Sequence, residues 1–415
     1  MQKGYKKDLQ YVKFCAYGFL KNLRFFDPFL ILFFLEKGLG FLEIGILYST
    51  REIVLMISEI PSGVISDTLG RRKTLIISFG VYILSFLVFY YSDSYMILIA
   101  AMILFAFGDA FRTGVHKAMI FNYLQVKGWG EYKVDYYGRT RSWSQTGSAV
   151  SAMISSVFVF FYGNYSIIFL VSIIPYLLDM ILVMSYPKYL DGVKGNFSKI
   201  LVKERFRVVF TATIQSVKKL RFISTLTNLS IYTAYYRIVK DYIQPVIQVF
   251  ALSIPIMIYY SDDQKVATTT GLIYTILFMI SAFASRNSGR MKQLFKNYRM
   301  AMNNTLIIGF VIGLSMALFF LMEIYIIVFL GFVIIVVIEN LRKPVGIGLI
   351  ADISDDKAMA TTLSITSQAK SVLAAIIAPV LGYFADLYNP GAAIGIISLI
   401  LLLLIPVYWL RPDRS

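Results

Sequence analysis

Cysteine, histidine and charge are all scarce in this chain. Cys15 is the one cysteine among 415 residues, which excludes an intrachain disulfide and a cysteine-rich metal site. Charged residues make up 15% of the chain, against roughly a quarter in soluble domains, while 58% of the residues are hydrophobic. Such a chain cannot hide its apolar surface in water. We therefore predict a membrane protein with no metal site and no cofactor.

Long apolar stretches separated by short polar connections predict an all-α membrane protein. One bilayer span needs ~20 mostly apolar residues, and the mean hydropathy of the whole chain is +0.68. We expect about twelve transmembrane helices. They cover residues 13–35, 42–66, 74–92, 95–124, 138–162, 166–187, 222–248, 266–286, 300–321, 324–349, 362–386 and 391–410. The first stretch is interrupted by charges, which favours a retained span over a cleaved signal.

Basic residues gather in alternate connections between these spans. The formal net charge is +16, and residues 188–221 carry nine Lys or Arg against Asp191 and Glu204. The positive-inside rule therefore predicts that this connection and both termini are cytoplasmic. We interpret the basic excess as orientation and contact with membrane lipids, and we expect no nucleic acid partner. A bacterial inner or plasma membrane is the expected location.

The same basic segment divides the spans into six and six. We predict an N-terminal six-helix bundle at residues 1–187, a cytoplasmic linker at 188–221 and a C-terminal six-helix bundle at 222–415. Apolar residues recur at helical spacing from Ile200 to Val217, which fits an amphipathic helix on the inner leaflet. A solvated linker helix without a lipid role stays an alternative.

A charged turn separates the second and third spans. Residues 63–73 read Gly-Val-Ile-Ser-Asp-Thr-Leu-Gly-Arg-Arg-Lys, and so short a turn makes the two spans antiparallel. At the corresponding place in the second half, Ser285–Lys292 keeps a Gly-Arg pair without an acidic partner. Faint symmetry of this kind occurs in transporters built from two similar halves.

The full pattern of this turn resembles the signature loop of the major facilitator superfamily. The resemblance implies two bundles around a central cavity that opens to each side of the membrane in turn. It also implies that the loop braces the inner ends of the two halves. By this resemblance, the gating residues are Gly63, Asp67, Gly70, Arg71 and Arg72.

Charged residues inside the spans are the best candidates for substrate chemistry, because each costs ~3 kcal/mol or more at bilayer depth and normally faces a cavity or a partner. Spans three, nine and twelve carry none, and Asp179 in span six has no explanation in this scheme. The predicted substrate-binding residues are Arg24, Arg112, His116, Arg237, Lys240 and Arg342, a set that would attract a carboxylate, phosphate or sulfate. The predicted ion-coupling residues are Asp27, Glu52 and Asp109.

A structural interpretation of the same charges is also open. Arg24 and Asp27, Asp109 and Arg112, and Glu339 and Lys343 are spaced three or four apart, as are Arg112 and His116, and Arg237 and Asp241. Each pair could share one helix face and neutralise itself. For His116, a proton relay and a hydrogen-bonded structural role both fit.

We predict a secondary active transporter that moves a small organic solute by alternating access and is not an enzyme. Motifs for nucleotide hydrolysis, zinc proteolysis and serine hydrolysis are absent from the sequence. The expected solute is anionic or zwitterionic, and the expected coupling ion is a proton, although sodium fits the sequence equally. We expect a monomer. The alternatives are an exporter of amphipathic compounds and a lipid flippase, but the fifth span lacks the Gly-Pro pair usual in proton-coupled exporters.

Overall fold

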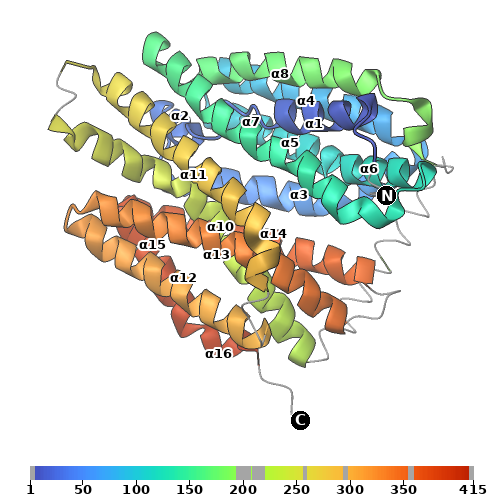
Figure 1. Ribbon diagram of the computed structural model, residues 1–415. Coiled ribbons are helices and arrows are strands. Elements are labelled where there is room, and N and C mark those ends of the chain that lie inside the picture. The colour runs from blue at the N-terminus through green and yellow to red at the C-terminus, as the bar shows by residue number, and fades with distance from the viewer. Residues whose placement is uncertain are drawn as a thin grey trace. The chain divides into compact units, whose positions relative to one another are not determined.

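The computed structural model describes residues 5–192, 207, 220–255, 259–292, 298–353 and 359–410. In these ranges every regular element is a helix (Figure 1). The α-helices are α1 (Leu9–Lys21), α2 (Leu30–Glu36), α3 (Phe41–Leu69), α4 (Arg71–Tyr91), α5 (Tyr95–Arg112), α6 (Val115–Val126), α7 (Lys133–Tyr162), α8 (Ile167–Met184), α10 (Leu220–Ser253), α11 (Asp262–Lys292), α12 (Tyr298–Leu321), α13 (Tyr325–Ile353), α14 (Met359–Leu387), α15 (Pro390–Leu403) and α16 (Ile405–Tyr408). Two short 3₁₀ helices, η1 (Gly130–Tyr132) and η2 (Lys188–Asp191), follow α6 and α8.

Each predicted span corresponds to a helix or to a broken pair of helices. The first is broken into α1 and α2, the fourth into α5 and α6, and the last into α15 and α16. Gly114 breaks the fourth, because its φ of +80° is a left-handed conformation that glycine adopts without strain. Among the described residues, eight helices are long and apolar enough to cross a membrane. The fold class is the predicted all-α membrane protein.

The chain forms two compact units. Unit 1 contains residues 1–33, 54–204 and 257–282, and unit 2 contains residues 34–53, 205–256 and 283–415. Helix α3 therefore begins in unit 2 and ends in unit 1, while α11 begins in unit 1 and ends in unit 2. The predicted linker helix lies outside the described residues apart from Arg207, and the predicted domain bounds stay a prediction.

Unit 1 has an aromatic core, in which α4 packs against α5 and α8. Phe26, Phe86 and Phe169 are within 5.2–6.3 Å of one another by ring centroid, and Tyr176 meets Phe86 edge to face at 4.9 Å. Such pairs add to the stability that burial of the rings provides. These ring contacts join α4 and α8, and α4, α5 and α8 carry the polar groups described below.

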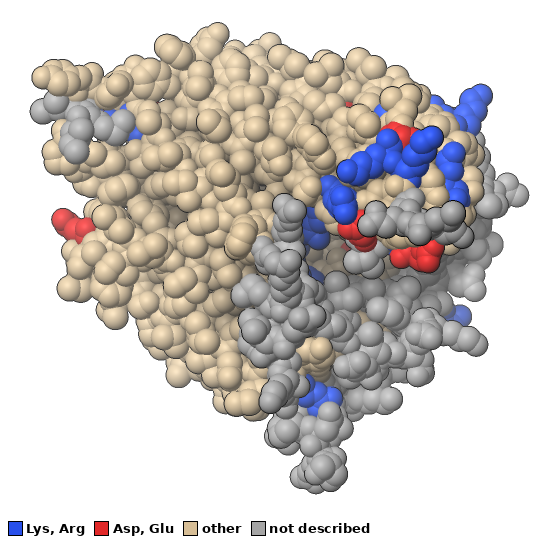
Figure 2. All heavy atoms as spheres, in the orientation of Figure 1, with Lys and Arg blue, Asp and Glu red and all other residues tan. Residues whose placement is uncertain are grey.

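Most of the described surface on the face shown in Figure 2 is uncharged, as expected of a surface in contact with lipid. Most of the Lys and Arg side chains visible on that face gather in one patch. Unit 1 exposes basic residues ahead of α1, at the start of α4, at both ends of α6, in the first turns of α7 and in η2. They are Lys6, Lys7, Lys73, Lys117, Lys127, Arg139, Arg141 and Lys188.

Candidate functional site

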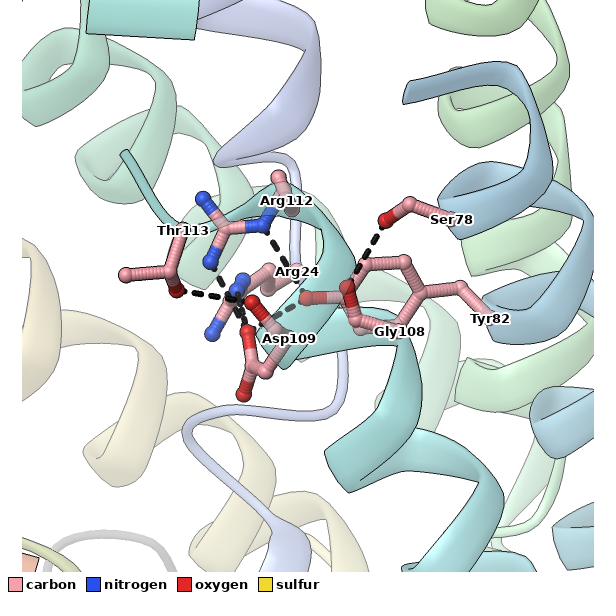
Figure 3. Close-up of polar contacts among 7 residues, drawn as sticks. All are labelled: Arg24, Ser78, Tyr82, Gly108, Asp109, Arg112 and Thr113. Carbon is pink, nitrogen blue, oxygen red and sulfur yellow. Dashed lines mark hydrogen bonds and ion pairs between the residues drawn. The ribbon is translucent and has the colours of Figure 1, made fainter. Parts of the chain in front are cut away.

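A buried ion cluster in unit 1 is centred on Asp109 (Figure 3). Arg112 donates from Nη2 to Asp109 Oδ1 at 2.8 Å, and Arg24 donates to the same oxygen at 3.4 Å. The Tyr82 hydroxyl donates to this oxygen as well, and it accepts from Arg112 Nε at 3.0 Å. The Arg24, Arg112 and Asp109 side chains are 14%, 16% and 7% exposed. Two guanidinium groups therefore share one carboxylate oxygen.

The end of α5 positions Asp109 and Arg112. They lie in the last turn of the helix, three residues apart, so both point to the same side. Thr113 caps the helix, because its hydroxyl donates to the Asp109 backbone oxygen at 2.7 Å, and Gly114 then turns the chain. The predicted pairing of Asp109 with Arg112 is confirmed.

Close packing of α4 on α5 brings Tyr82 to Asp109. A Cβ at Gly108 would lie 2.9 Å from the Tyr82 ring, so only glycine lets the ring lie flat on α5. Ser78, one turn earlier on α4, donates to the Gly108 backbone oxygen at 2.7 Å. Tyr82 itself is completely buried. Charge alone gave no reason to single out Tyr82, so this residue is absent from the predicted site.

Arg24 reaches Asp109 because the first span is not a continuous helix. Helix α1 ends at Lys21, Asn22 caps it by donating from Nδ2 to the Gly18 backbone oxygen at 2.7 Å, and residues 22–29 form turns and irregular chain. The expectation that Arg24 and Asp27 share one helix face was therefore wrong. Freed from α1, the Arg24 side chain extends to α5 instead.

His116 is packed between aromatic rings in unit 1. Its imidazole stacks on the Tyr17 ring at 3.5 Å with an interplanar angle of 7°, and its Nε2 lies 3.2 Å from the Tyr186 hydroxyl. The helix break at Gly114 removes it from the α5 face that Arg112 occupies, so the expected i, i+4 relation between these two residues was wrong. These contacts fit the structural alternative, and the substrate role of His116 stays a prediction.

Unit 2 contains a second ion pair, between Arg237 of α10 and Glu52 of α3. Arg237 Nη1 lies 2.5 Å from Glu52 Oε2, with the arginine side chain 34% exposed and the glutamate side chain 2% exposed. Lys240 lies 3.3 Å from the neighbouring Asp241. The sequence predicted a helix-face pair of Arg237 with Asp241, but Arg237 instead bonds to a residue 185 positions away.

Arg342 of α13 is buried within unit 2 and is fully engaged there. It donates to Asn228 O at 2.8 Å, Asn228 Oδ1 at 2.9 Å, Thr305 Oγ1 at 2.9 Å and the Met302 backbone oxygen, and its guanidinium lies 4.9 Å from the Tyr232 ring centre. These contacts join α10, α12 and α13. They favour a structural role over the predicted substrate role, which stays a prediction. The predicted pairing of Glu339 with Lys343, at 3.3 Å, is confirmed.

The charged turn bonds to other parts of unit 1. Gly70 has φ +92° and begins α4, and the Arg72 backbone N–H donates to Asp191 Oδ1 at 2.9 Å. Arg72 also donates to Met184 O at 2.9 Å, and Arg71 donates to Ala118 O at 3.2 Å. The two arginines thus hold the end of α8 and the first turn of α6 near the start of α4. Gly63 and Asp67 lie within α3, and the gating role of all five residues stays a prediction.

Comparison with known proteins identifies the family. The sequence profile of the Major Facilitator Superfamily matches residues 14–341. The uncharacterized MFS-type transporter YxaM of Bacillus subtilis (strain 168) is 36% identical over 103 residues, which is 24% of this chain and 26% of that relative. The match thus spans about a quarter of the relative's length.

Solved transporter structures share the fold. The nucleoside transporter NupG superposes with a TM-score of 0.72 at 13% identity, covering 97% of this chain and 98% of its own. A D-xylose-proton symporter gives 0.68 at 13% identity over 97% of both chains. The peptide transporter POT in complex with sulfate gives 0.67 at 14% identity, covering 99% and 96%. With the family match over most of its length, the chain belongs to the major facilitator superfamily of membrane transporters.

Proposed function

We propose that this transporter carries a small anionic or zwitterionic organic solute and couples its movement to a proton. One observation carries the proposal: Asp109 is shared by Arg24 and Arg112 in a largely buried site. A single carboxylate balances one guanidinium, so these three side chains keep one positive charge. A carboxylate, phosphate or sulfate on a solute could take up that charge with paired hydrogen bonds, for which the planar guanidinium is well suited.

The same arrangement offers a route to proton coupling. Asp109 and a solute anion would compete for Arg112, because both need the same N–H donors. Protonation of Asp109 would remove its charge and release Arg112 to the solute, so that proton and anion bind together. Asp27 and Glu52 stay the other candidate coupling residues. In unit 2 Glu52 and Arg237 form an equivalent carboxylate and guanidinium pair, in which Arg237 is partly exposed.

Two transporters of the same fold act with or bind the kinds of ion proposed here. One is a D-xylose-proton symporter and another is a peptide transporter in complex with sulfate. At 13–14% identity these proteins bear on the fold alone, so the argument for this chain depends on its own arginines. The exposed basic residues at one end of unit 1 support a cytoplasmic location for that end. We also propose a monomer with cytoplasmic termini.

Uptake into proteoliposomes tests the solute class and the coupling ion together. The probes are radiolabelled organic carboxylates, organic phosphates, neutral sugars and lipophilic cations, each offered with and without an inward proton gradient and with sodium replaced by potassium. We expect accumulation of one or more of the anions, driven by the proton gradient and indifferent to sodium. Accumulation of lipophilic cations alone would instead support an exporter of amphipathic compounds, and would refute the proposal.

A further inference from the structure

Asp179, in the middle of α8, is a buried acid that the ion cluster around Asp109 leaves unpaired. The residue is 0% exposed, and neither carboxylate oxygen has a hydrogen-bond partner among the described residues. No ion pair in the described part of the chain includes it. An isolated buried carboxylate is costly, and a native structure normally pairs it, neutralises it or gives it a ligand.

The surroundings of Asp179 contain cations that act on it from a distance. Lys21 at the end of α1 and Arg112 of α5 both interact with it electrostatically. Arg112, however, is already bonded to Asp109 and Tyr82. Of these two cations, Lys21 is the one that takes no part in the cluster around Asp109.

Tyrosines also surround Asp179, and His116 lies against two of them, stacked on Tyr17 and 3.2 Å from the Tyr186 hydroxyl. Tyr17 of α1 and Tyr186, beyond the end of α8, interact with it electrostatically. Tyr176 lies one turn before it on α8, is buried without a hydrogen-bond partner for its hydroxyl, and packs against Tyr82 of α4. Phenols stay neutral near pH 7, so they can donate to a carboxylate but cannot neutralise it.

We propose that Asp179 is a proton-binding site and that its carboxyl group holds the proton in this conformation. The neutral acid removes the cost of an unpaired charge. When the proton is lost to water, the Asp179 carboxylate must pair with the Lys21 ammonium group or with Arg112. Pairing with Arg112 breaks the bond between Arg112 and Asp109, so Asp109 and Asp179 compete for one guanidinium. A sodium ion fits the same place poorly, since Lys21 and Arg112 repel it.

As a coupling site, Asp179 rests on the proposed proton-driven transport, but its protonation can be measured without any solute. The experiment is a pH titration of the purified full-length protein by infrared difference spectroscopy, with the proton as the probe. The wild type is expected to show the C=O stretching band of a neutral carboxylic acid at pH 7. Asp179→Asn is expected to lose that band at every pH, while Asp109→Asn, which frees Arg112 for Asp179, is expected to lose it at a lower pH than the wild type does. Asp93→Asn, at an exposed aspartate, should leave it unchanged.

Absence of the band from the wild type, or its persistence in Asp179→Asn, would overturn the proposal, as would its loss on replacing potassium with sodium. If Asp179→Asn does not fold, Lys21→Met keeps the acid and removes the nearby cation. The pH at which the band disappears should then differ between Lys21→Met and the wild type. If this pH is the same in both proteins, the site is refuted. The band could be lost in Asp179→Asn while solute uptake does not respond to a proton gradient. That result would support Asp179 as a proton-binding site and refute its role in coupling.

Discussion

Asp109→Ala is expected to destabilise the protein by about 3–5 kcal/mol, the usual cost of removing one partner of a buried ion pair. The substitution leaves Arg24 and Arg112 close together with no carboxylate between them, and it leaves the Tyr82 hydroxyl without its acceptor. Thermal and denaturant unfolding of the purified protein in detergent measures the loss. Transport should also fall to background, because the two arginines would no longer be held in position.

Asp135→Ala is the matched control for this prediction. Asp135 pairs with Arg139 at 3.0 Å within the first turns of α7, but both side chains are more than half exposed, at 53% and 54%. A solvent-exposed pair contributes about 0–1 kcal/mol. The account therefore requires a clear difference between the two alanine variants, and equal stabilities would refute the buried network as a source of stability.

Arg342→Met should have a similarly large effect through a different cause. The methionine fills much of the same volume. It removes, however, the guanidinium N–H groups that donate to oxygens of Asn228, Met302 and Thr305. Buried acceptors left unpaired cost about 1–3 kcal/mol each, so a total of several kcal/mol is expected. The measurement is the midpoint of thermal unfolding, combined with the fraction of monodisperse protein after extraction from the membrane.

Arg139→Met, at the exposed arginine of α7, tests whether any loss of a cation would do the same. Arg139 pairs with Asp135 at 3.0 Å, and both side chains are more than half exposed. Removing this cation should change the unfolding midpoint far less than Arg342→Met. If Arg342→Met instead left stability unchanged and abolished only transport, Arg342 would be a substrate residue, as the sequence analysis predicted.

The all-α membrane fold could be predicted from the sequence because it depends on local composition. Each apolar stretch is long enough to be a span on its own, and the charged turn at residues 63–73 carries a family pattern that needs no tertiary information. The i, i+3 pair of Asp109 and Arg112 and the i, i+4 pair of Glu339 and Lys343 were predictable for the same reason, since helix geometry fixes such neighbours.

The long-range partners could not be predicted, because they depend on how the helices pack. Arg24 pairs with Asp109, 85 residues away, only because the chain leaves α1 after Lys21. Arg237 and Arg342 look alike in the sequence, yet Arg237 is partly exposed beside Glu52 while Arg342 is enclosed by backbone and side-chain oxygens. The hydrogen bond between Tyr82 and Asp109 could not be predicted either, because an uncharged aromatic residue in an apolar span usually contributes only to packing.

Binding of an anion identified by the uptake panel, measured on purified wild type and Arg112→Gln, tests the central claim most directly. Arg139→Gln, at an exposed arginine of the same unit, is the control. A hydrogen bond to a charged group contributes about 1.5–3 kcal/mol, and 1.4 kcal/mol corresponds to tenfold in affinity. The account predicts that Arg112→Gln weakens binding by about 10- to 100-fold while Arg139→Gln binds as the wild type does. Equal affinity of Arg112→Gln and wild type would contradict it.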